Sequence, residues 1–285
     1  MSQTGEAAER GREVEPLGPG SLIWRYLGDM RYGLGGRAAS TMQVMHPAIG
    51  AAVADEELSL FFKEPIARFA RSMPLILGVV YDGPLAHATA DELRDRHLAI
   101  KGTDHHGRRF HALDPDVFYW AHATFVHLLF QSIERFDHTM TGAERERLYD
   151  ECRRWYRMYG LSERPMPEDF DAFQAYLDRM CEEELEATPT AVRGKAMFAD
   201  PRTIPQNYLP SWLWRIVSPL PLRLSVFMST ALMPPAVRAK MGYTWTAADE
   251  RRFQRLASVI KRLWPLLPYR LRYAPQARAA FARTR

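Results

Sequence analysis

The stretch PDVFYWAHATFVHLLFQSIERFD, residues 115–137, places aromatic and aliphatic side chains on nearly every side of a helix. A helix that is apolar all round belongs inside a large domain, not on its surface. Asp114 followed by Pro115 is typical of a helix start, because the carboxylate caps free amides and proline fits the first turn. We therefore predict that this helix runs through the middle of the fold and that His122 lies inside the protein.

Working outward from this helix, periodic apolar stretches recur between glycine and proline, and alternating strand patterns bounded by tight turns are absent. Thr141 with Glu144 three residues later predicts a capping box, and Pro74 predicts a kink. The sequence thus predicts an all-α fold, with one multi-helix domain over 21–285 after a disordered leader over 1–20. Helices are expected over 38–54, 59–81, 86–100, 115–137, 142–159, 167–186, 222–232 and 247–264.

Composition limits the class of protein. The chain has 285 residues, 47% apolar and 25% charged, which is ordinary for a globular domain that buries its own core. The leader carries six charges and lacks the central apolar stretch of a signal peptide, so the sequence does not predict a secretory signal. The two cysteines, Cys152 and Cys181, form no metal motif and fit a reducing compartment. No apolar run reaches membrane-spanning length, so we expect a cytoplasmic protein.

The last 35 residues are strongly basic. Residues 251–285 contain ten Arg or Lys and no acid, so a chain of net charge +4 carries about −6 before them. Apolar residues recur among these cations at helical spacing: Leu256, Ile260, Leu263, Trp264 and Leu267. We favour an amphipathic helix docked on its own domain with a solvated basic face. The alternative is peripheral contact of this tail with an anionic membrane, at its inner face.

All nine histidines lie between His46 and His138. His97 shares a core-facing stripe of the predicted helix 86–100, whereas Arg94, Asp95 and Arg96 are expected to point elsewhere. From this pattern alone His97 is either a hydrogen-bonded core histidine or a ligand. The other members of the stripe are Ala86, Ala90, Leu93 and Ile100.

A second group of histidines, His105, His106 and His111, lies in the polar segment DHHGRRFHALDP. We interpret this segment as a solvated loop, with a metal site as the alternative, because metal ligands need fixed positions and supporting contacts. His46 precedes Pro47 and is interpreted as a packing residue. The sequence lacks the motifs of nucleotide-binding proteins, zinc proteases and serine hydrolases, and it shows no nucleic-acid-binding pattern.

Four separated segments resemble the bacterial branch of the MpaB-type and latex-clearing-protein (rubber oxygenase) family. The resemblance extends over roughly residues 20–283. It implies a globin-like helical core that holds haem b, and O₂-dependent oxidative cleavage of carbon–carbon double bonds in hydrophobic, often isoprenoid, substrates. The segments are MQVMHPAIGAAVAD, EPIARFARSMPLILGVVYDG, RDRHLAIKGTDHHGRRFHALDPDVFYWAHATFV and STALMPPAVRAKMGYTW.

The resemblance also implies roles for particular residues. The iron-binding histidine of the family corresponds to His97 in RDRHLAIKG. The distal arginine and threonine correspond to Arg68 and Ser72 in ARFARSM, with Arg71 at the neighbouring basic position and serine replacing threonine. Arg68 is expected to stabilise charge on bound oxygen or to hold a haem propionate.

The histidine of YWAHATF, His122, corresponds to another family position, and three roles stay open for it: lining the haem cavity, acting as the alternative iron ligand, or filling the core. Glu56 and Glu57 lie near the position of a proposed family base, and neither is assigned. The predicted function is a haem-dependent oxygenase acting with O₂ on a hydrophobic, unsaturated substrate. Its rivals are a haem or lipid carrier without enzyme activity, and a cofactor-free helical scaffold at a membrane.

Overall fold

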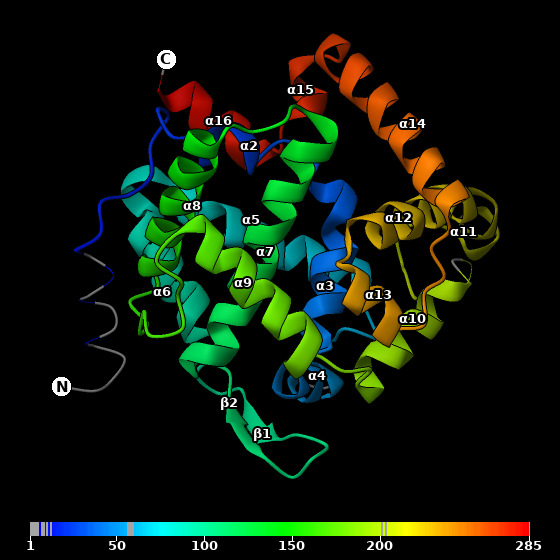
Figure 1. Ribbon diagram of the computed structural model, residues 1–285, viewed down its shortest axis with the longest axis horizontal. Coiled ribbons are helices and arrows are strands. Elements are labelled where there is room, and N and C mark those ends of the chain that lie inside the picture. Colours follow the sequence, from blue (N-terminus) through cyan, green and yellow to red (C-terminus); the bar gives the residue numbers. More distant parts are fainter. Residues whose placement is uncertain are drawn as a thin grey trace.

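The computed structural model describes residues 6, 9, 11, 13–55, 60–200, 202 and 204–284. These residues form a helical body with one small two-stranded sheet at its edge (Figure 1). This confirms the all-α prediction. The helices of the first half are α2 (Leu22–Tyr26), α3 (Gly36–Val44), α4 (Pro47–Ala54), α5 (Pro65–Tyr81), α6 (Ala86–Asp95) and α7 (Pro115–Phe136). The second half contains α8 (Gly142–Arg157), α9 (Phe170–Arg179), α10 (Pro189–Ala199), α11 (Ser211–Val217), α12 (Pro219–Leu232), α13 (Pro235–Lys240), α14 (Ala247–Leu263), α15 (Tyr269–Arg272) and α16 (Pro275–Arg283).

Shorter helical turns join these elements. The 3₁₀ turns are Tyr32–Gly35, Gly83–Leu85 and Trp264–Leu266, and a π-helical turn spans Met180–Glu184. The π turn continues α9, so the predicted helix 167–186 is a shorter α-helix followed by a wider turn.

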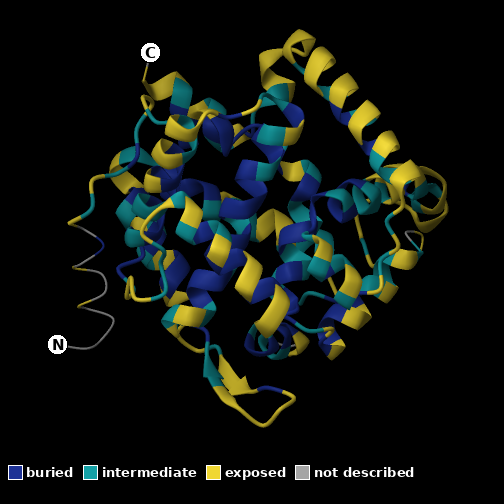
Figure 2. Ribbon diagram, in the orientation of Figure 1, coloured by how far each residue is buried: buried dark blue, intermediate teal, exposed yellow. Residues whose placement is uncertain are grey.

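Helix α7 occupies the middle of the body, as predicted. Trp120, Ala123, Val126 and Leu129 are completely shielded from solvent, and α7 contacts α3, α8 and α14. Figure 2 shows its buried residues at the centre, with exposed residues on the outer helices. Burial on all sides explains why its apolar residues follow no single stripe.

Both predicted helix starts are present. The Asp114 carboxylate accepts a hydrogen bond from the amide of Asp116 at 3.0 Å. The Thr141 hydroxyl accepts from the amide of Glu144, whose carboxylate accepts from the amide of Thr141 in return. These bonds satisfy amides that have no partner inside the helix.

Proline and turn geometry shorten several predicted helices. The expected helix 38–54 is two helices, α3 and α4, because Pro47 starts a new one. Helix α5 begins at Pro65 and runs without interruption through Pro74. Helix α6 ends at Asp95, five residues before the predicted boundary, and its chain continues as a turn.

A small β-hairpin follows that turn, where the sequence predicted only a polar connection. Strands β1 (Lys101–Thr103) and β2 (Arg109–His111) pair antiparallel, with Gly102 opposite Phe110. The hairpin projects from the helical body near α4 (Figure 1). Three-residue strands, one exposed and one partly buried, carry too short an alternation to be recognised in the sequence.

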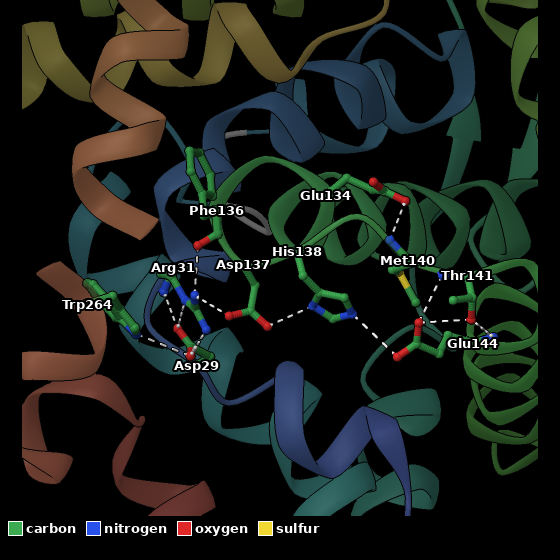
Figure 3. A network of polar contacts seen from close by, with 10 residues as sticks. All are labelled: Asp29, Arg31, Glu134, Phe136, Asp137, His138, Met140, Thr141, Glu144 and Trp264. Carbon is green, nitrogen blue, oxygen red and sulfur yellow. Dashed lines mark hydrogen bonds and ion pairs between the residues drawn. The ribbon is translucent and has the colours of Figure 1, made fainter. Parts of the chain in front are cut away.

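Segments from the first and last parts of the chain, around Asp29 and Tyr273, meet on the opposite side of the molecule. Asp29 pairs with Tyr273 in an isolated β-bridge, and the Asp29 carboxylate accepts a hydrogen bond from the Trp264 indole at 3.2 Å. Arg31 joins Asp29 to Asp137, with 2.8 Å between charged atoms in each pair. Figure 3 shows this network continuing through His138 to Glu144. A polar cavity of about 240 Å³ adjoins it.

The basic tail packs mainly through its apolar face. Phe253 and Ala257 are buried and Leu256 and Ile260 are partly buried, which agrees with the favoured interpretation of a docked amphipathic helix. Leu263 belongs to the predicted stripe but is 54% exposed. Within the described part of the chain, no helix combines the length and the apolar character needed to cross a bilayer.

Candidate functional site

Helices α5 and α6 pack against each other and carry the residues that the sequence singles out. Arg68, Arg71 and Ser72 lie on α5, and His97 lies in the turn that follows α6, where its amide donates to the carbonyl of Arg94 at 2.9 Å. The pKa of His97 is lowered mainly by burial, and the positive charges of Arg68 and Arg96 act in the same direction.

The His97 imidazole is held through one nitrogen. Its Nδ1 lies 2.7 Å from the carbonyl oxygen of Leu93, and Phe118 packs edge-on with 5.6 Å between ring centroids. Because a carbonyl only accepts, Nδ1 carries the proton and Nε2 keeps a lone pair. Burial, and then the charges of Arg68 and Arg96, lower the pKa of His97, so the ring is neutral near pH 7. A neutral imidazole oriented by a carbonyl is the usual form of a metal-binding histidine.

Arg68 is a partly shielded cation. Burial is the main cause that lowers its pKa, followed by the charge of Arg71. Its guanidinium lies over the ring of Phe61, 5.4 Å from the centroid. No ion pair joins Arg68 to a carboxylate among the residues that the structure describes. A shielded cation of this kind is suited to receive an anionic group from outside the protein.

The two neighbouring residues on α5 differ from each other in surroundings. Ser72 lies one turn after Arg68 on the same face and is partly buried. Arg71 is half exposed and forms an ion pair with Glu64, with 3.2 Å between the charged atoms. The structure therefore places Arg71 at the surface end of this group.

Arg94 corrects one expectation. It was predicted to point away from the core, yet it is only 3% exposed. Its guanidinium bonds the carboxylates of Asp91 at 2.8 Å and Asp95 at 3.2 Å, and it reaches toward the carbonyl of Tyr159. These partners explain the burial, because a charged group enters the interior only when its hydrogen bonds are replaced.

His122 lies inside the body, as predicted, and its Nε2 is occupied. The atom lies 3.2 Å from the carbonyl oxygen of Cys152, and Trp155 packs edge-on at 4.7 Å. Burial lowers the pKa of His122 to about 3. Sequence reasoning did not single out His127, which is also buried, bonds the carbonyl of Leu232 at 3.3 Å and has its pKa lowered to about 4.

The histidines of the hairpin separate into two groups. His105 and His106 meet Glu186, a residue 80 positions later in the chain, whereas His111 lies apart and bonds the carbonyl of Leu98 at 3.1 Å. Sequence reasoning missed Glu186, because nothing in its neighbourhood indicates a contact with the hairpin. Glu56 and Glu57 lie outside the described residues.

Comparison with known proteins agrees with the resemblance of the sequence motifs. Residues 24–262 match the family model described as ER-bound oxygenase mpaB/B'/rubber oxygenase, catalytic domain. Uncharacterized proteins of Mycobacterium bovis and Mycobacterium tuberculosis are each 25% identical over 238 residues, which cover 80% of this chain and 87% of theirs. No solved structure matches the chain significantly. The chain therefore belongs to the mpaB and rubber oxygenase catalytic-domain family.

Proposed function

We propose that this protein is a haem b-dependent oxygenase that acts with O₂ on a hydrophobic, unsaturated substrate of isoprenoid or lipid type. Its membership of an oxygenase family supports the reaction class. The observation that carries the cofactor proposal is the His97 imidazole, which is neutral and is fixed through Nδ1 by the Leu93 carbonyl.

The residues present fit a b-type haem. An imidazole with Nδ1 bonded to a carbonyl offers Nε2 to iron, which is the donor that haem proteins of the globin type use. Arg68 offers a partly shielded positive charge without a carboxylate partner among the described residues. When bound, the haem supplies the activation of O₂. The protein supplies ligation through His97 and positive charge through Arg68.

Arg68 and Ser72 are assigned to the binding of O₂. The Arg68 guanidinium would supply positive charge there, and the Ser72 hydroxyl, one turn away on the same face of α5, would donate a hydrogen bond. Arg71, which is nearer the surface and paired with Glu64, is assigned to a haem propionate. The propionate would replace the Glu64 carboxylate, so Arg71 would exchange one carboxylate partner for another of the same kind.

His122 is assigned to the core rather than to iron. Its Nε2 is hydrogen-bonded to the backbone carbonyl oxygen of Cys152, and binding of iron through Nε2 would require that bond to break inside a group of aromatic rings. Of the three roles that the sequence left open, the packing role fits these contacts best.

We also propose peripheral contact with an anionic membrane at the inner face, which would give access to a lipid-like substrate. Two surfaces support it. Trp212, Ile216 and Leu220 of α11 and α12 are 66–79% exposed. Leu266 and Leu271, which lie among the arginines of the basic tail, are 78% and 56% exposed. Exposed apolar groups of this kind, beside cations, suit an interface with anionic lipid.

The experiment that tests the haem assignment measures bound haem in His97→Gly and in His122→Ala, after expression with excess haem precursor. We expect His97→Gly to lose the Soret band and to regain it with added imidazole, because the free base replaces the missing ligand. His122→Ala should keep a full haem complement and lose stability, because a core hydrogen bond and packing volume disappear.

His111→Ala is the matched control, since this histidine lies on the hairpin with its own carbonyl partner, and it should bind haem as the native protein does. If His97→Gly binds haem fully and His122→Ala is folded but free of haem, the iron ligand is His122 of α7. If the native protein contains no haem b in a pyridine haemochrome assay, the cofactor-free scaffold is the remaining function. Haem without O₂ uptake across an isoprenoid panel would favour the carrier.

A further inference from the structure

Three metal-ligating side chains converge where the hairpin meets the connection between the π-helical turn and α10. His105 Nε2 lies 2.5 Å and His106 Nε2 lies 2.7 Å from the same oxygen, Oε1 of Glu186. The two imidazole rings are 4.1 Å apart between centroids. The hairpin that carries both histidines stands out from the body in Figure 1, so the group is open to ions from solution.

The loop that presents the histidines is held in shape by Asp104. This carboxylate is only 7% exposed and accepts hydrogen bonds at 2.9 Å from the amides of His106 and Arg108. It also accepts from the Arg108 side chain at 2.9 Å. Gly107 completes the turn with φ of +81°, a conformation that side-chain-bearing residues rarely adopt. The two imidazoles therefore start from a fixed backbone.

The opposite ligand is fixed as well. The amide of Glu186 donates to the carbonyl of Met45 at 3.1 Å, and its own carbonyl accepts from the amide of Thr188 at 2.9 Å. The ammonium of Lys240 donates to the carbonyl of the preceding residue, Leu185, at 2.6 Å. Backbone bonds on both sides of Glu186 thus hold it against the body of the protein.

We propose that His105, His106 and Glu186 form a site for a divalent transition-metal cation of the Zn²⁺ type, separate from the haem site. Two imidazole nitrogens and one carboxylate oxygen are ligands that zinc accepts, with a further position open to water.

The geometry needs only a small adjustment. Zinc bonds of about 2.0–2.1 Å place the ligands of a tetrahedral ion roughly 3.3 Å apart. All three ligand atoms already lie within 4.8 Å of one another, and each imidazole would withdraw from Glu186 by less than about 1 Å. Such a shift is within reach of side-chain rotation at exposed residues. Nitrogen ligands also exclude Mg²⁺ and Ca²⁺, which prefer oxygen.

A bound ion would connect the hairpin to the α9–α10 side of the molecule. The hairpin is joined to the turn of His97, because the amide of Ala112 donates to the carbonyl of Ile100 at 2.8 Å. Occupancy therefore restrains the segment that directly follows His97. The site itself does not depend on haem, so its test is independent of the proposed oxygenase activity.

Calorimetric titration of ZnCl₂ into tag-free protein stripped with EDTA tests the proposal, and titration with Co²⁺ reports the ligand geometry by visible absorption. We expect one Zn²⁺ per chain in the native protein. Glu186→Gln and the double variant His105→Ala/His106→Ala should each weaken binding by at least about tenfold. Added Mg²⁺ should not compete.

His111→Ala is the matched control, because it removes a histidine of the same hairpin that lies outside the group. It should bind Zn²⁺ with native affinity, and circular dichroism at 25 °C should show that every variant is folded. The proposal is overturned if the double variant binds Zn²⁺ as tightly as the native protein. It is equally overturned if His111→Ala loses as much affinity as Glu186→Gln.

Discussion

Arg68 is a cation partly shielded from water, and no ion pair joins it to a carboxylate among the described residues, so it is the position of the proposed site best suited to a test by mutation. Removal of a charged donor aimed at developing negative charge typically lowers turnover by about 100-fold. We expect Arg68→Ala to keep haem and to lose turnover on this scale, and Ser72→Ala to lose less. O₂ uptake normalised to bound haem measures both effects.

Arg157→Ala provides the comparison for Arg68, because it removes a surface arginine paired with Glu163. Its O₂ uptake should equal that of the native protein. Loss of haem without a change in turnover per haem in Arg68→Ala would assign this residue to a propionate instead of to oxygen.

At the residue scale, the sequence correctly predicted that His122 lies inside the protein. The roles of His97, Arg68 and Ser72 stay predictions that rest on the resemblance. The burial of Arg94 was missed because its approach to the Tyr159 carbonyl exists only in the folded chain, although its partners Asp91 and Asp95 are close in sequence. The pairing of Glu186 with the hairpin was missed because a contact across 80 residues leaves no local pattern.

At the scale of the elements, the start of α8 allows a test of how much a capping box contributes to the stability of the protein. Its capping box joins Thr141 and Glu144 through reciprocal hydrogen bonds. Thr141→Ala leaves amides of the first turn without a partner and should lower the free energy of unfolding by about 1 kcal/mol. Urea denaturation measures the change. Thr139→Ala, an exposed position just outside the helix, should leave the midpoint unaltered, and an equal loss there would refute the capping explanation.

Element types were predictable and boundaries less so. The apolar pattern and cap of α7 identified the central helix correctly. The break between α3 and α4, the early end of α6 and the hairpin were not predicted. In each case a turn residue or a tertiary contact outweighed a weak helical periodicity, and such contacts are not encoded within a short window.

For the molecule as a whole, buried histidines predict loss of stability in acid. Burial lowers the pKa of His122 to about 3 and that of His127 to about 4, below the ordinary value near 6.5. Between these values the unfolded chain binds protons that the folded protein excludes, so stability falls as pH decreases. Linkage gives roughly 2 kcal/mol lost per histidine between pH 7 and 5.

Urea titrations at pH 7 and pH 5 measure this loss of stability. The His127→Gln variant should lose less stability than the native protein between pH 7 and pH 5. Asp137 and Glu144 add a second phase at lower pH, because hydrogen bonds and nearby cations lower their pKa values and protonation removes those interactions. Unchanged stability from pH 7 to 5 would mean that these imidazoles are accessible to protons in the folded state.

The proposed membrane contact is also a property of the whole surface. Truncation of the tail is unsuitable as a test, because Ala277 and Ala280 belong to the core. Instead, Leu266→Ser/Leu271→Ser should reduce sedimentation with phosphatidylglycerol vesicles at low salt, because both apolar and electrostatic attraction contribute. Phosphatidylcholine vesicles provide the uncharged control. If this variant binds the vesicles as the native protein does, and Trp212→Ser/Ile216→Ser does not, the membrane contact is made by α11 and not by the tail.

The closure of the fold by distant segments has a consequence for how the protein is made. The amide of Met30 donates to the carbonyl of Arg272, and the amide of Ala274 donates to the carbonyl of Gly28, both at 2.8 Å. A ribosome synthesises residues 28–30 long before residues 272–274 exist. The segment that follows α2 therefore lacks these hydrogen-bond partners until residues 272–274 have been synthesised, and this part of the fold closes last.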